Sequence, residues 1–281
     1  MRRIDRLWHI LTRQWLTPLG RLDLIRIVAA RREKRAGFYP IHSCVGELLV
    51  DGQNAATDFQ VLGQVLLDEF YVEVELKDRI VLDIGAHKGY FAAYALAAGA
   101  KAVVSYEPEP TNFYCLSHFA ESAHRHDKTI EVVQAAVSNQ EGELPLYTSS
   151  ESWSHSLFPQ ESQSNLQTVP VRVVSLSNVL AEVREAFPVE RLVLKVDAEG
   201  AECPLLLDSR ADIFAPVIEI VFEHHSFAPC GLEDIIHRLQ SLGFQYLPSA
   251  REGDLHLMRR PSLPVAPRAW CKTASDEPPH H

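Results

Sequence analysis

The sequence predicts an α/β fold: a doubly wound, mostly parallel seven-stranded sheet with an antiparallel last strand, preceded by a helical N-terminal extension. From residue 80 onward, short apolar segments alternate with segments of helical periodicity, the pattern of parallel strands joined by crossover helices. The last two apolar segments, 244–247 and 255–258, flank Gly253 closely enough to pair as an antiparallel hairpin. The chain has 281 residues, 46% of them hydrophobic, a globular composition that excludes disordered and fibrous classes.

The individual elements follow from local patterns. Strands are predicted where short apolar runs are bounded by turn residues: 46–50, 80–84, 102–106, 130–133, 144–147, 169–174, 192–196, 217–222, 244–247 and 255–258. Helices are predicted where apolar residues recur every three or four positions: 4–15, 22–35, 59–70 with Asp58 as its cap, 90–98, 110–123, 176–187 and 232–242. The polar segment 148–168 is long for a compact domain and is interpreted as a lid.

Charge and proline content divide the chain into three parts. We expect a basic helical extension over 1–45, a main domain over 46–260 and an irregular proline-rich tail over 261–281. The first 35 residues have nine Arg and one Lys against three acidic residues, whereas the whole chain has a net charge of −10. We favour packing of the extension on the main domain over a membrane-surface or partner helix, and its apolar face is a candidate homodimer surface. The net negative charge argues against a nucleic-acid partner.

The cysteine pattern predicts reduced thiols in a cytoplasmic protein. The five cysteines are odd in number, widely spaced and without a C-x-x-C pair: Cys44, Cys115, Cys203, Cys230 and Cys271. Arginines interrupt every N-terminal apolar stretch, so neither a secretory signal nor a transmembrane segment is predicted.

A glycine-bearing turn follows the first strand of the alternating region. Residues 83–89 read D-I-G-A-H-K-G, in which Gly85 and Gly89 permit a tight turn and a close approach of backbone to a ligand. The pattern of a dinucleotide-binding fold has its first glycine at the position of Asp83. A carboxylate at that position disfavours a pyrophosphate, which argues against a dinucleotide. The Asp83 carboxylate instead suits a ligand with an amino group.

An acidic residue ends the next strand. Glu107 lies 24 residues after Asp83, where an acidic side chain can accept both hydrogens of a ribose diol, and Pro108 stiffens the turn. The ligand inferred from both positions has a ribose and an amino group but no pyrophosphate, which fits S-adenosylmethionine. In the alternative interpretation Asp83 caps the next helix and Glu107 is a solvated turn residue.

Three segments carry a resemblance to a known family: V-L-D-I-G-A-H-K-G at 81–89, Y-E-P-E-P-T-N-F at 106–113 and L-K-V-D-A-E-G-A-E at 194–202. Over about 80–247 the chain resembles the FkbM family of class I S-adenosylmethionine-dependent methyltransferases. The resemblance implies methyl transfer, usually to oxygen, on a small-molecule or glycan acceptor. It also implies that the cofactor lies against Gly85, Ala86 and Gly89, with Ala136 beside the adenine. His87 and Lys88 depart from the residues common there, as does Ala198.

The strand ends also supply candidates for catalysis. Asp197 and Glu199 follow the strand 192–196, where two carboxylates could act as a general base or hold a divalent cation, although Glu199 could instead only open the next helix. His224 and His225 follow the strand 217–222 and point in opposite directions, so only one of them can face the site, and we select His224.

Other chemistries have weaker support. His155 in the long loop is a less favoured base, and no compact His/Cys cluster has metal-ligand spacing, so no metal site is assigned. The competing functions are an inactive scaffold that keeps the fold and a nicotinamide-dependent oxidoreductase.

Overall fold

The computed structural model describes residues 16–32, 36–66, 70–148, 155–158, 167–188, 191–247 and 255–261. A seven-stranded sheet forms its centre, with strand order β11-β12-β10-β9-β3-β4-β5. The strands are β3 (Ile80–Ile84), β4 (Ala102–Tyr106), β5 (Ile130–Val133), β9 (Leu192–Val196), β10 (Val217–Glu223), β11 (Gln245–Leu247) and β12 (Leu255–Arg259). β12 runs antiparallel to both of its neighbours, whereas the pairs from β10 to β5 are parallel. The predicted doubly wound sheet with an antiparallel last strand is confirmed.

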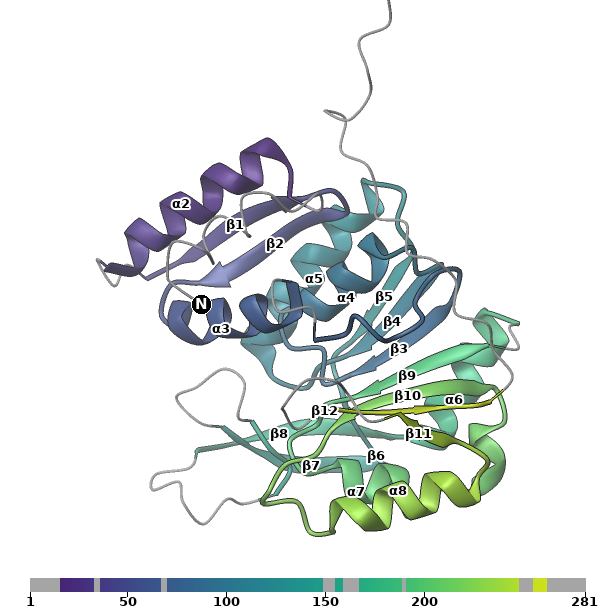
Figure 1. The fold of residues 1–281 in the computed structure, drawn as a ribbon. Helices are drawn as coiled ribbons and strands as arrows, with labels where there is room; N and C mark the ends of the chain where they lie inside the picture. Colours follow the sequence, from purple (N-terminus) through teal and green to yellow (C-terminus); the bar gives the residue numbers. More distant parts are fainter. Residues whose placement is uncertain are drawn as a thin grey trace, which may run out of the picture.

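Helices cover both faces of this sheet (Figure 1). One face packs on α4 (Tyr90–Ala97) and α5 (Pro110–His124), and the other packs on α6 (Leu176–Ala186), α7 (Glu202–Leu206) and α8 (Leu232–Ser241). Successive strand residues alternate between these two cores, because side chains in a strand point to opposite faces. Val81 accordingly belongs to the α4 core and Leu82 to the α6 core.

The described part of the extension is not purely helical. It contains α2 (Pro18–Arg32) and β1 (Phe38–Ser43), and the predicted main domain begins with β2 (Gly46–Asp51) and α3 (Ala55–Leu66). β1 pairs antiparallel with β2, so the prediction of helix up to residue 35 followed by a single strand missed β1. The predicted helix over 4–15 and the tail from 262 onward lie outside the described residues. α2 exposes the apolar side chains of Leu19, Leu22 and Ile25, and the homodimer remains a prediction.

A smaller sheet stands beside the main one. It consists of β6 (Ala136–Ser138), β7 (Gly142–Thr148) and β8 (Gln167–Ser175) in the order β6-β8-β7. The strands expected at 144–147 and 169–174 are confirmed as β7 and β8, whereas β6 was not predicted. Most of the proposed lid between β7 and β8 lies outside the described residues. None of the helices in the described ranges has both the length and the apolar character that a membrane crossing requires.

Asp58 does not cap a helix as predicted. It lies inside α3, where its Oδ1 is 2.5 Å from Nζ of Lys88 and both side chains are wholly buried. The second carboxylate oxygen, Oδ2, accepts the backbone N–H of Asp51 at 2.7 Å. Lys88 therefore joins the glycine turn after β3 to α3.

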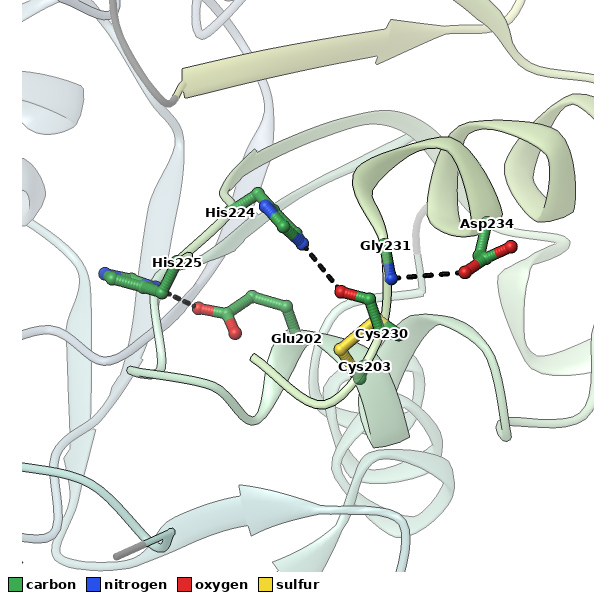
Figure 2. The surroundings of a disulfide bond; sticks show 7 residues. All are labelled: Glu202, Cys203, His224, His225, Cys230, Gly231 and Asp234. Atoms are coloured by element: carbon green, nitrogen blue, oxygen red, sulfur yellow. Dashed lines mark hydrogen bonds and ion pairs between the residues drawn. A yellow bond between two sulfur atoms is a disulfide. The ribbon is translucent and has the colours of Figure 1, made fainter. Parts of the chain in front are cut away.

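The prediction of reduced cysteines is wrong for at least three of the five. Cys203 and Cys230 form a disulfide between α7 and the loop after β10 (Figure 2), and Cys44 is disulfide-bonded as well. Cys115 is a free, buried thiol. Spacing along the chain did not reveal the pair, because the fold brings together cysteines that are 27 residues apart. The free-thiol argument for a cytoplasmic protein no longer holds.

Candidate active site

A cavity of about 410 Å³ lies at the carboxyl ends of the parallel strands. Ligands bind at this edge of open α/β sheets, because the loops that follow adjacent strands diverge there. Gly85 after β3, Glu107 after β4, Asp197 after β9 and Glu223 at the end of β10 all line the cavity. The strand order therefore brings the two halves of the predicted site, a glycine turn with an acidic residue and a carboxylate cluster, into one space.

Glu107 is held in place by two backbone amides. His87 N–H donates to its Oε2 at 2.8 Å, and Glu109 N–H donates to its Oε1 at 2.9 Å. Each oxygen keeps further acceptor capacity, so the carboxylate can accept two more hydrogen bonds from a diol. Burial raises the pKa of Glu107 to about 8, despite the opposing effect of the two amides.

The glycine turn is packed against the end of β9. Gly85 has a φ of +74°, and a Cβ at this position would lie 1.7 Å from the carbonyl oxygen of Asp197. Nζ of Lys195 donates to the Gly85 carbonyl at 2.7 Å and lies 3.1 Å from Oδ1 of Asp83. Burial alone would lower the pKa of Lys195, but the carboxylates of Asp83 and Asp197 raise it above its usual range.

The structure separates the predicted cofactor residues into two groups. The cavity is lined by four of them: Gly85, Glu107, Pro108 and Ala136. Three do not line it: Asp83, Ala86 and Gly89. Asp83 is wholly buried and faces Lys195. It is therefore not placed to contact the amino group of a ligand directly. Gly89 instead serves as the N-cap of α4.

Asp197 and Glu199 both line the cavity, as the sequence pattern suggested. The strand ends at Val196, so a turn and not strand alternation brings the two carboxylates together. Both carboxylates face Nε2 of His225, which lies 3.9 Å from Oδ1 of Asp197 and 3.5 Å from Oε1 of Glu199.

The choice of His224 over His225 is corrected by the structure. Nε2 of His224 donates to the Cys230 carbonyl at 3.0 Å (Figure 2), and His224 does not line the cavity. His225 lines the cavity, and its Nδ1 donates at 2.7 Å to Oε1 of Glu202, a wholly buried side chain (Figure 2). The two rings diverge as expected for adjacent residues, but the sequence offered no signal for which one faces inward.

Carboxylates dominate the electrostatics at this end of the cavity. Burial would lower the pKa of His225, but Glu199, Glu202 and Asp197 raise it to about 11. The neighbouring Asp197 carboxylate and burial raise the pKa of Glu223 to about 8. Sequence reasoning did not select Glu223 or Glu202, because neither forms a recognisable motif without the strand order that places them beside His225.

Two non-glycine residues of the cavity have left-handed backbone conformations. His87 has a φ of +52° and Glu199 a φ of +47°. Such conformations are uncommon outside glycine and are found preferentially at functional sites. His155 of the long loop also reaches the cavity, where burial lowers its pKa.

Comparison with known proteins gives one match over most of the main domain. The family model described as the methyltransferase FkbM domain matches residues 83–246, more than half of the chain. This range holds the glycine turn, Glu107 and the carboxylate cluster. No curated protein matches the sequence.

Several solved structures are distantly similar to this chain. A putative RNA methyltransferase from Pyrococcus horikoshii is 16% identical with a TM-score of 0.37, covering 83% of this chain and 96% of its own. Magnesium protoporphyrin IX methyltransferase from Synechocystis, solved with its bound cofactor, is 9% identical with a TM-score of 0.37, covering 92% and 90%. A putative tRNA methyltransferase from Streptococcus pneumoniae is 15% identical with a TM-score of 0.41, covering 70% and 73%. Their acceptors differ, and similarities this distant carry no argument about the acceptor of this chain.

Proposed function

Because the chain belongs to the FkbM methyltransferase family, we propose that it transfers the methyl group of S-adenosylmethionine to a hydroxyl of a small-molecule or carbohydrate-like acceptor. The observation that carries this proposal is that one cavity is lined both by Glu107, after β4, and by Asp197, Glu199 and Glu223, which follow or end β9 and β10 on the other side of β3. It offers a place for a ribose and, within the same space, carboxylates for an acceptor.

The residues present fit this cofactor. When bound, S-adenosylmethionine supplies an electrophilic methyl group on a sulfonium. The Glu107 carboxylate, fixed by two amides, would accept the ribose hydroxyls, and Ala136 with its neighbours would lie against the adenine. Gly85 leaves room beside the end of β9 because it has no Cβ. Asp83 acts indirectly, by holding the lysine that fixes the Gly85 carbonyl.

The acidic end would receive the acceptor. In an in-line displacement the O–C bond forms as the C–S bond breaks, and the hydroxyl proton passes to a base. Asp197 and Glu199 are the candidate bases, since both line the cavity beside His225. Several carboxylates in one place suit an acceptor with several hydroxyls, whereas they repel the phosphates of a nucleic acid.

Calorimetric titration with S-adenosylmethionine and S-adenosylhomocysteine tests the proposal. We expect Glu107→Ala to weaken binding by about 2–4 kcal/mol, because two charge-assisted hydrogen bonds are lost. This is roughly a 30- to 700-fold loss of affinity. Glu131→Ala removes an exposed carboxylate from β5 and should leave the affinity unchanged. Absence of binding by the folded wild-type protein would reject the proposal and favour a scaffold, whereas binding of NAD would favour an oxidoreductase.

The affinity for S-adenosylhomocysteine should rise with pH. Since a ribose diol donates to the ionised carboxylate, binding favours the deprotonated form of Glu107, whose pKa is about 8 before the ligand binds. Affinity should therefore climb as pH rises from about 6 and level off above about 8. Glu107→Gln removes this titration, so calorimetry across the same range should give a flatter profile. Equal slopes for the two proteins would show that other groups, such as His155, cause the dependence.

A further inference from the structure

Three potential metal ligands converge at the acidic end of the cavity. They are a carboxylate oxygen of Asp197, a carboxylate oxygen of Glu223 and a ring nitrogen of His225, all within 4.8 Å of one another. β9 and β10 are parallel neighbours with Val196 paired to Phe222, so the residues that follow the two strands lie side by side. From this convergence we propose that Asp197, Glu223 and His225 form a binding site for a divalent cation.

The position of His225 provides a second, independent argument. A carboxylate can only accept, so the 2.7 Å contact with Glu202 requires a proton on Nδ1 of His225. Nε2 faces Asp197 and Glu199 at the cavity, and it becomes the ligating nitrogen when the metal replaces its proton. Metal-binding histidines are typically held in this way by a carboxylate on the other ring nitrogen.

Glu202 also needs positive charge nearby. Its side chain is wholly buried, and among the described residues its Oε2 has no hydrogen-bond partner. A buried carboxylate is costly unless it is paired. A metal that replaces the proton on Nε2 of His225 would keep positive charge on the ring that contacts Glu202. The Cys203–Cys230 disulfide, next to Glu202 in sequence, fixes the two elements that carry this pair (Figure 2).

The cations beside this group, Lys195 and His225, are shared among five carboxylates, those of Asp83, Asp197, Glu199, Glu202 and Glu223. Glu223 has no ion-pair or hydrogen-bond partner in the described part of the chain. Asp197 lies 3.5 Å from Nζ of Lys195, but this amine also serves Asp83 and the Gly85 carbonyl. Two adjacent carboxylates that share so little positive charge and line an accessible cavity are suited to a divalent ion.

The ligand set indicates the kind of ion. Two carboxylates and one imidazole, with room for water, combine the hard oxygen ligands of magnesium and manganese with a nitrogen that first-row transition metals accept. Mn²⁺ satisfies both preferences. In the proposed methyltransferase, on which this role rests, the ion would bind an acceptor oxygen, and Glu199, outside the ligand set, would remain to take its proton.

The test is a titration of the full chain with Mn²⁺, followed by the loss of the free-ion signal in electron paramagnetic resonance. We expect one site in the wild-type protein and at least a ~10-fold weaker one in Glu223→Gln. Glu202→Gln keeps the size of the side chain but removes its charge, and should weaken Mn²⁺ binding roughly 10- to 100-fold. Glu131→Gln is the control for an exposed carboxylate and should bind as the wild type does.

The outcomes separate this proposal from the function on which it rests. Circular dichroism would verify that each variant is folded. Wild-type protein that binds S-adenosylhomocysteine but not Mn²⁺ overturns the cation site and leaves the methyltransferase proposal standing. If the wild-type protein binds Mn²⁺ but not S-adenosylhomocysteine, and Glu223→Gln loses the Mn²⁺ binding, the result supports the site and overturns the cofactor proposal. Equal Mn²⁺ affinity in wild type and Glu223→Gln also overturns the site, because the ion then binds elsewhere.

Discussion

Lys88→Met should lower the free energy of unfolding by about 3–5 kcal/mol, because it leaves the Asp58 carboxylate buried without its counter-ion. Both side chains are wholly inaccessible to solvent, so water cannot replace the lost ammonium. Methionine keeps most of the volume of the lysine stem, which limits the contribution of a cavity. Urea denaturation, with the slope compared between variants, measures the effect.

The double variant Asp58→Asn/Lys88→Met is the matched control. It removes both charges but keeps a side-chain oxygen for the Asp51 amide, which donates to Asp58 in the native protein. Replacing both members of a buried ion pair is often nearly neutral, so the double variant should recover most of the lost stability. A double variant as unstable as Lys88→Met alone would show that packing, and not the unpaired charge, causes the loss.

Gly85→Ala should cost about 2–5 kcal/mol of stability and weaken cofactor binding severely. A methyl group at this position would lie 1.7 Å from the Asp197 carbonyl oxygen, a backbone atom that cannot move without displacing the end of β9. The displacement would also shift the turn that carries Asp197, so both ends of the cavity would be disturbed. Thermal unfolding and titration with S-adenosylhomocysteine measure the two effects.

Gly99→Ala separates backbone strain from collision. Gly99 has a φ of +94°, but its added Cβ would meet nothing closer than 3.5 Å. It should therefore cost only the ~1–2 kcal/mol of a left-handed non-glycine residue, and cofactor affinity should not change. If the two alanine variants were equally stable and bound the cofactor equally well, the close approach of Gly85 to β9 would be of no consequence.

The sequence was sufficient to predict the strands that form the main sheet. β3, β4, β5 and β9 begin and end at the predicted residues, because each is a short apolar run bounded by polar or glycine residues. β1 and β6 were not predicted. β1 contains Pro40 and His42, and β6 has three residues, so neither has the apolar run that local pattern reading requires.

The candidate site was predictable where one chain segment defines it. Gly85 and Glu107 are both recognisable from the end of a strand, and both line the cavity. Glu223 joins the site because its strand lies beside the strand that precedes Asp197. Glu202 joins it through a hydrogen bond to His225, 23 residues away, so neither residue has a local sequence signature. The inward orientation of His225 follows from contacts that form only on folding, which is why the pattern could not separate it from His224.

The Cys203–Cys230 bond also affects the denatured chain. It closes a covalent ring across a separation of 27 residues, and this ring contains the whole of β10 together with Glu223 and His225. Closing a loop of this length lowers the conformational entropy of the unfolded ensemble, which raises its free energy by about 3–4 kcal/mol. Glu202 is attached to the ring at Cys203, so in the oxidised chain it stays tethered to His225 even when the sheet is lost. Folding of the oxidised protein therefore starts with these partners already confined to a small volume, whereas a reduced chain must first find that arrangement.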